Sequence, residues 1–298
     1  MTMSDSSSDE KKKKVLVISG GGVYGAIPCC FLNTTHPKDF QKISVVGGTS
    51  VGGMIALHLS LYGNPQMAND EFFQNVGSFF QRGIRNRIDP FSPKYESDGV
   101  ERKLKEMLVG TVADCKMRFV VPCLNFKTVE PVVFHNFDES YSHMELWKIA
   151  RATSAAPTYF PPFSENILVD GGILENLPIM TTASVICKYW NARPSDLDVF
   201  AIGTGRMMPD GRKTLDAVSR YSKLDWARTL MPILTTKGNE MMSRLWGENM
   251  GFNSFTLFNP VAVSGNGIDG ISEIDTIREK CEIYLGDFTQ KWKRFLED

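Results

Sequence analysis

Short apolar runs rich in β-branched residues alternate with longer helix-compatible segments along most of the chain. Such runs are typical of strands that are buried on both faces of a sheet. The pattern predicts strands at 15–19, 43–46, 118–126, 131–135, 167–169, 197–202 and, at an edge, 254–258. It predicts helices at 26–32, 54–61, 145–151 and 274–296, in two parts of 69–108, and over most of 215–245. This alternation indicates an α/β fold with a mostly parallel sheet covered on both faces, and the absence of a repeat or linker favours one domain.

A polar, proline-containing segment at residues 81–99 interrupts the helical pattern and predicts a loop. Basic and apolar side chains are mixed in it, namely Arg82, Arg85, Arg87, Lys94, Ile84, Ile88 and Phe91. This mixture suits an anionic interface, so we expect a mobile lid or a membrane-facing loop. A solvated connector between helices is the alternative.

The composition is that of an ordinary globular protein. Of 298 residues, 42% are hydrophobic and 22% are charged, and a formal net charge of -1 gives no bulk basicity for binding nucleic acid. The polar start of the chain lacks the apolar region of a secretion signal, so we expect residues 1–13 to form a disordered tail. Its lysines could touch anionic lipid, although a solvated run of charge is the alternative. No apolar run is long enough to span a membrane, so any membrane contact would be peripheral.

The six cysteines are scattered and lack the paired spacing of a metal site. They occur without export features, which favours a reducing, cytoplasmic setting. The sequence therefore predicts no metal site, and it gives no indication of the oligomeric state.

A candidate nucleophile lies in the sequence Gly48-Thr49-Ser50-Val51-Gly52, between a predicted strand and a predicted helix. A G-x-S-x-G sequence in this context can form a sharp turn that exposes the serine hydroxyl at the end of a sheet. The helix that follows directs the positive end of its dipole to the same place. A glycine-rich turn with an incidental serine is the alternative, but the flanking elements favour Ser50 as a nucleophile, with Gly48 and Gly52 allowing the turn.

The base that would activate this serine is not an obvious histidine, because the chain has four histidines and none after His143. A triad that uses His135 or His143 stays open as an alternative. Asp170, followed by Gly171 and Gly172, is the better candidate, because it ends a predicted strand of a parallel sheet. Burial would have to raise the pKa of its carboxyl for it to act as a base. A simple Asp-Gly-Gly turn is the alternative.

The glycine-rich stretch Gly20-Gly21-Gly22-Val23-Tyr24-Gly25 matches a dinucleotide-binding pattern, G-x-G-x-x-G. That reading largely fails, because the second strand ends in the serine turn and not in the acidic residue that would bind a ribose. The backbone N–H groups of Gly20, Gly21 and Gly22 could instead stabilise the oxyanion of a bound ester.

Taken together, the stretches GGGVYG, GTSVGG, RATSAAPTYFPP and DGGILENLP resemble the patatin-like phospholipase family over roughly residues 14–205. Carried over by position, the nucleophile falls on Ser50, the catalytic aspartate on Asp170 and the oxyanion glycines on Gly20 to Gly22. Gly25, Gly171 and Gly172 fall on supporting positions. Asn176 and Pro178 match the end of the Asp-Gly-Gly block. Ser19, Tyr24 and Leu177 depart from the residues that are frequent in the family.

The resemblance implies a three-layer α/β/α fold, with a catalytic core at 14–205 and a helical completion of the same domain at 206–298. It implies a serine hydrolase that cleaves fatty-acyl esters, with membrane glycerophospholipids as the first substrate class and no metal or organic cofactor. Because Tyr24 replaces a frequent cation, a catalytically weak lipid-binding or regulatory protein is the alternative, and a reductase is a distant third.

Overall fold

The protein was analysed as a computed structural model that describes residues 12–83, 92–164, 166–207, 219–220, 222, 238–263 and 268–297. Of the expected tail at 1–13, residues 1–11 lie outside these residues, whereas Lys13 already belongs to the first strand. So do the central part of the expected lid, residues 84–91, and most of the expected helix at 215–245.

A central sheet of seven strands runs through the molecule in the order β4-β3-β2-β1-β6-β8, with β5 paired to β3 beside this path. The strands are β1 (Lys13–Ile18), β2 (Ile43–Gly48), β3 (Arg118–Asn125), β4 (Glu130–His135), β5 (Leu168–Asp170), β6 (Leu197–Ile202) and β8 (Ser254–Phe258). The neighbouring pairs β3-β2, β2-β1, β1-β6 and β6-β8 are parallel, whereas β4 and β5 both run antiparallel to β3. The prediction of a mostly parallel sheet with 254–258 at an edge is therefore confirmed.

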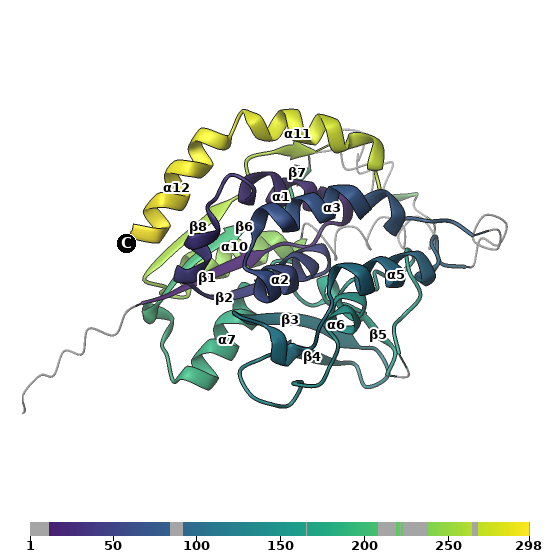
Figure 1. The fold of residues 1–298 in the computed structure, drawn as a ribbon, viewed down its shortest axis with the longest axis horizontal. Coiled ribbons are helices and arrows are strands. Elements are labelled where there is room, and N and C mark those ends of the chain that lie inside the picture. The colour runs from purple at the N-terminus through teal and green to yellow at the C-terminus, as the bar shows by residue number, and fades with distance from the viewer. Residues whose placement is uncertain are drawn as a thin grey trace, which may run out of the picture.

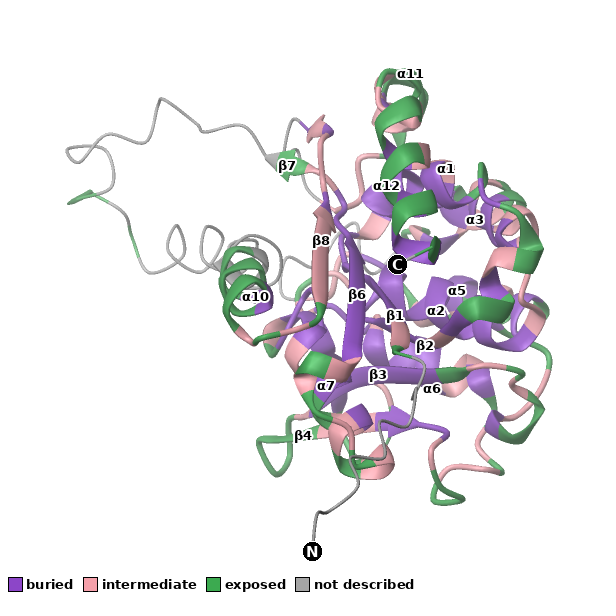
Figure 2. Cartoon of the chain, turned by 90° about the vertical axis from the view of Figure 1, so that its left-hand side faces the viewer, coloured by how far each residue is buried: buried purple, intermediate pink, exposed green. Residues whose placement is uncertain are grey.

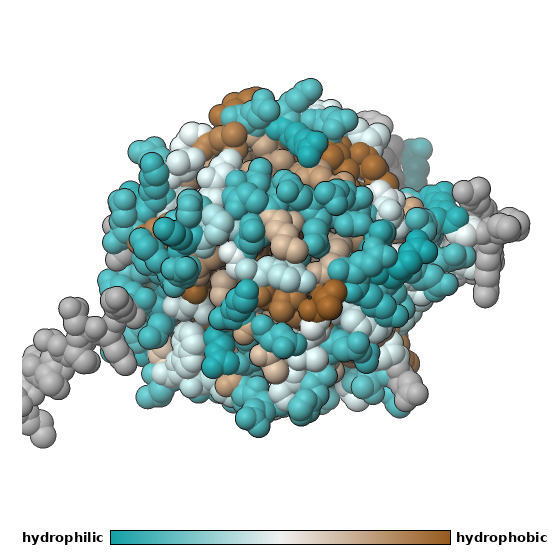
Figure 3. Space-filling view, in the orientation of Figure 1, coloured by the Kyte–Doolittle hydropathy of each residue, from teal (hydrophilic) through white to brown (hydrophobic). Residues whose placement is uncertain are grey.

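Helices cover both faces of this sheet, which gives the three layers seen in Figures 1 and 2. One layer contains α1 (Ala26–Leu32), α2 (Val51–Tyr62), α3 (Pro65–Phe79), α5 (Ser97–Met107), α6 (Leu146–Thr153), α11 (Ile274–Glu282) and α12 (Leu285–Glu297). The other contains α7 (Ile179–Trp190) and α10 (Gly238–Asn249). The short strands β7 (Arg206–Met207) and β9 (Ala262–Val263) pair separately. The face in Figure 3 is mainly hydrophilic, with small apolar patches.

Alternate residues of the strands enter two separate cores, as expected for a sheet that is covered on both sides. In β1, Leu16 and Ile18 face the larger core, while Val15 and Val17 face a smaller one formed with α7. The strand pattern read from the sequence thus has its physical cause in burial on both faces.

The end of the chain packs on the larger core, because α12 places Phe288, Trp292 and Phe295 against Phe200 of β6. The expected single helix at 274–296 is two helices, α11 and α12. That residues 206–298 complete the same domain remains our proposal. Among the described residues, no helix is both long and apolar enough to cross a membrane.

Two strands of opposite direction, β2 and β5, pair with the same edge of β3. The parallel strand β2 pairs with the first part of this edge, up to Val120, and the antiparallel strand β5 pairs with the second part, from Cys123. The opposite edge is taken by β4 over residues 120–125. Because β2 and β5 run toward each other along this edge, the turns that follow Gly48 and Asp170 lie close together, beside Pro122 of β3. The expectation that Asp170 ends a parallel strand was wrong, but the antiparallel pairing is what directs it toward the end of β2.

Candidate active site

Ser50 lies on a sharp turn between β2 and α2 and is nearly buried, with 8% of its surface exposed. Its backbone is strained, with φ 54° and ψ −127°, as expected for a serine that projects its hydroxyl from a nucleophile turn. The backbone N–H of Ser50 donates to Oγ1 of Thr153 at 3.1 Å, and Thr153 in turn donates to the carbonyl of Pro122 at 2.7 Å. Thr153 therefore fixes the serine turn to β3.

The two glycines of the turn allow α2 to approach the sheet closely. A Cβ on Gly52 would collide with the carbonyl oxygens of Ile18 and Ser19, and one on Gly48 would collide with the backbone of Gly52. That Gly48 and Gly52 allow a nucleophile turn stays our prediction. Gly25 has a similar function, since a Cβ there would collide with Val51.

Asp170 is buried, and its carboxylate accepts a hydrogen bond from the N–H of Gly172 at 2.7 Å. Burial raises the pKa of this carboxyl to about 6, against the opposing effects of the Ser50 hydroxyl and the Gly172 N–H. Gly171 lies against the carbonyl of Pro122, where a Cβ would not fit. The structure thus brings Asp170 close to Ser50.

None of the four histidines, all of which are described, hydrogen-bonds Ser50 or Asp170. His135 instead packs among the rings of Phe137, Tyr141 and Tyr189, and burial lowers the pKa of its imidazole. The geometry therefore favours the aspartate over either histidine as the partner of Ser50.

The glycine loop after β1 is held in place through Gly20. Its N–H donates to the carbonyl of Asn176 at 2.8 Å, and its own carbonyl accepts from Asn176 Nδ2 at 3.2 Å and from Thr204 Oγ1 at 2.5 Å. The Gly20 amide is consequently engaged. In the described part of the chain no acceptor is found for the N–H groups of Gly21 and Gly22, which leaves these two as the donors that an oxyanion could use.

Ile268 covers the end of this loop. Its carbonyl accepts the N–H of Val23 at 2.8 Å and lies so close to Gly22, at φ +60°, that a Cβ there would collide with it. The next residue, Asp269, pairs with Lys94 and accepts the hydroxyl of Tyr95. The segment that follows Ile268 is therefore attached to the far end of the expected lid, at residues 94–95.

A small apolar cavity of about 30 Å³ opens beside Ser50. Its lining comes from α2, α3, α5, the loop after α6 and Ile268, and includes Met54, Phe72, Val76, Phe79, Phe160 and Val100. Side chains of this kind suit the hydrocarbon part of an ester. A cavity of this size has room for about one water molecule, so an acyl chain would have to displace part of the wall.

Thr153 and Thr204 position the serine turn and the glycine loop, and sequence reasoning singled out neither residue. For Thr153 it gave only the stretch at 151–162, whose resemblance to the family implies a buried loop that supports the site. Spacing does not reveal these roles, because each residue acts on a backbone group far away in the sequence. Tyr24 takes the position of the cation that is frequent in the family and is buried, with its hydroxyl 3.4 Å from Glu273. In the described residues no group of three or more His, Cys, Asp or Glu side chains is placed to hold a metal ion.

Comparisons with known proteins agree with the resemblance read from the sequence. A family model described as patatin-like phospholipase matches residues 16–183. The cGAMP-activated phospholipase of Pseudomonas aeruginosa is 33% identical over 249 residues, which cover 79% of this chain and 74% of that protein. Patatin-like protein 1 of Oryza sativa subsp. indica is 27% identical over 230 residues, which cover 63% of this chain and only 56% of the rice protein. Among solved structures, VipD of Legionella pneumophila matches with a TM-score of 0.48 and 11% identity, over 93% of this chain and 67% of VipD.

Proposed function

This chain belongs to the patatin-like phospholipase family, and from that premise we propose that it hydrolyses fatty-acyl esters of membrane glycerophospholipids with Ser50 and Asp170. The observation that supports this most directly is the position of Asp170, a buried carboxyl with a pKa of about 6, beside the strained Ser50. A general base works best when its pKa lies near the working pH.

In the proposed reaction, Asp170 takes the hydroxyl proton as Ser50 Oγ attacks the acyl carbonyl. The N–H groups of Gly21 and Gly22, together with the dipole of α2, stabilise the oxyanion that forms. Collapse of the tetrahedral intermediate breaks the ester bond, and the leaving alkoxide receives the proton from Asp170. Asp170 then takes a proton from a water molecule, and the resulting hydroxide attacks the carbonyl of the acyl-enzyme. When the bond to Ser50 Oγ breaks, the fatty acid is released and Asp170 gives its proton back to Ser50.

The apolar cavity at Ser50 supports a lipid acyl chain as the part of the substrate beside the nucleophile. Contact with a membrane surface, where such chains are found, is part of this proposal and would be peripheral. Activity in a cytoplasmic setting is likewise proposed from the sequence.

A fluorophosphonate probe and a phospholipid assay test the proposal together. We expect labelling at Ser50 and release of fatty acid from phosphatidylcholine vesicles, both lost in Ser50→Ala. Ser60→Ala is the matched control, because Ser60 is a buried serine of the helix that follows Ser50 and its hydroxyl has no partner among the described residues. The assay should be run with and without cGAMP, since one relative is named for activation by that nucleotide.

The alternative, a catalytically weak lipid-binding or regulatory protein, makes the opposite forecast. Binding to vesicles with neither labelling of Ser50 nor release of fatty acid, under both conditions, would favour it and overturn the hydrolase proposal.

A further inference from the structure

A larger hollow lies at the opposite end of the elements that carry the nucleophile. We call it the basal pocket and define it by Lys38, Tyr62, Lys116, Met117, Arg118 and Asn136. Strand β2 begins there, at Ile43, and ends at the serine turn, while α2 begins at the serine turn and ends there, at Tyr62. A helix of 12 residues is about 18 Å long, so the basal pocket is separate from the site at Ser50.

Among the residues that the structure describes, the charged side chains that line the basal pocket are Lys38, Lys116 and Arg118, and none of the lining side chains is a carboxylate. In the part of the chain that the structure describes, none of the three forms an ion pair with an acidic side chain. The neighbouring Asp39 is directed elsewhere, since it accepts from Trp292 Nε1 and from the backbone of His36, both at 3.1 Å. A concentration of positive charge in a chain of net charge -1 points to an anionic ligand.

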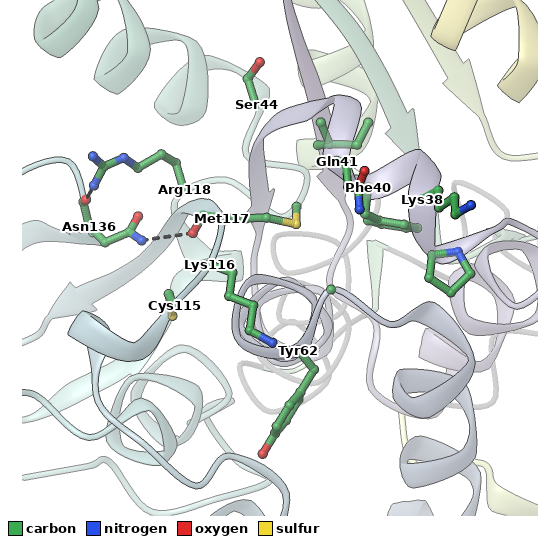
Figure 4. Close-up of a pocket in the computed structure, with 13 residues that line it drawn as sticks. Lys38, Phe40, Gln41, Ser44, Tyr62, Cys115, Lys116, Met117, Arg118 and Asn136 are labelled. Atoms are coloured by element: carbon green, nitrogen blue, oxygen red, sulfur yellow. Dashed lines mark hydrogen bonds between the residues drawn. The ribbon is translucent and has the colours of Figure 1, made fainter.

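The walls of the pocket are held by hydrogen bonds that do not use the two lysine ammonium groups. Arg118 donates to the carbonyl of Asn136, whose amide donates to the carbonyl of Met117 at 2.9 Å. The backbone N–H of Lys116 donates to the carbonyl of Ser60 at 2.7 Å. In Figure 4, Lys116 extends toward Tyr62 near the middle of the view, and Lys38 and Arg118 stand on opposite sides. These hydrogen bonds therefore fix the walls of the pocket and leave the two lysine ammonium groups for a ligand.

The volume of the basal pocket and its combination of basic and apolar side chains indicate the class of ligand. The cavity measures about 630 Å³, within the range of about 300 to 1,000 Å³ that small-molecule sites occupy. Lysine and arginine are the side chains that proteins use most for phosphate. Tyr62 and Met117 add apolar wall that a bare inorganic ion would not contact. We propose that the basal pocket binds a soluble organic phosphate, such as a nucleotide, through Lys38, Lys116 and Arg118.

Titration calorimetry on the full chain tests this with three probes: ATP without divalent metal, inorganic pyrophosphate, and vesicles that contain a phosphoinositide. We expect ATP to bind at low salt, more tightly than pyrophosphate and more weakly as salt rises. The double variant Lys38→Gln/Lys116→Gln should weaken ATP binding at least about tenfold, because two charge-assisted contacts are lost. Lys127→Gln, which removes an exposed lysine of the β3–β4 turn, should leave ATP binding within about twofold of the original protein.

Three results would overturn the proposal: no ATP binding up to millimolar concentration, equal binding by the double variant, or binding of the vesicles alone, which would indicate a lipid headgroup. The double variant keeps Ser50 and Asp170, so its hydrolysis of a short soluble ester reports separately on the proposed enzyme. Loss of ATP binding with unchanged hydrolysis would support the basal pocket, whatever the outcome of the phospholipid assay.

Discussion

Replacing Asp170 by asparagine should remove activity and, at neutral pH, make the fold more stable. In the folded protein the carboxyl has a pKa of about 6 in place of its ordinary 3.8, because it is buried. The folded state therefore holds the proton more strongly than the unfolded chain, and the free energy of unfolding falls as the pH rises from about 4 through about 6. A difference of about two pH units between the two pKa values corresponds to about 3 kcal/mol above pH 7.

Asparagine has nearly the same shape, keeps an oxygen for the N–H of Gly172 and carries no charge. We expect Asp170→Asn to be more stable than the original protein by about 1 to 3 kcal/mol at pH 7.5, and by almost nothing at about pH 3. Urea denaturation at the two pH values measures both differences. The value of kcat/KM of the original protein should rise with pH to a plateau, with an apparent pKa of about 6.

The exposed Asp138 provides a control of opposite sign. A hydrogen bond from Tyr189 lowers the pKa of its carboxyl to about 2, so its ionised form supports the fold at neutral pH. Asp138→Asn should therefore destabilise the protein at pH 7.5, and this effect should fade as the pH falls below about 4. If Asp170→Asn were no more stable than the original protein at pH 7.5, or if its advantage did not depend on pH, our account of a buried, ionisable base would be refuted.

Three further predictions concern the surroundings of Ser50. Replacing His135 and His143 together should lower kcat modestly at most, and a loss of about a thousandfold with an unchanged melting temperature would instead indicate a histidine base. Thr153→Val should lower kcat by about tenfold or more, with a smaller change in KM, because the serine turn loses its tie to β3; full activity in steady-state kinetics would show that this tie is dispensable. Replacing the three arginines of segment 81–99 should weaken binding to anionic vesicles by about 1 kcal/mol per charge and spare a soluble ester; equal losses on both would contradict the lid.

The sequence predicted the elements whose cause is local. The buried strands can be recognised in the sequence by their apolar runs, and the serine turn by its glycines. Both patterns are local, because they follow from how neighbouring residues pack. The antiparallel direction of β5 could not be predicted in this way. It is a property of the assembled sheet, in which β5 pairs with the part of β3 that β2 leaves free.

The same limit applies to the residues that hold the site. Ser50 and Asp170 were identified because each is next to glycines in a strand-to-turn context, and the family resemblance carries both. Thr153 and Thr204 act on backbone groups of Ser50 and Gly20, which are 103 and 184 residues away along the chain. A single sequence contains no sign of such pairs, so only the folded structure reveals them.

The carbonyl of Ile268 has a consequence for substrate entry. It already accepts the N–H of Val23 and lies against Gly22, next to the amides that an ester carbonyl would need. An ester that approaches Gly22 from this side would meet that carbonyl, which is tethered to the same chain, so its local concentration does not fall on dilution. If Ile268 must withdraw before substrate can bind, the measured affinity is the intrinsic affinity multiplied by the fraction of molecules in which it has withdrawn. A change that loosens Asp269 from Lys94 and Tyr95 should then raise the apparent affinity for substrate without touching a catalytic group.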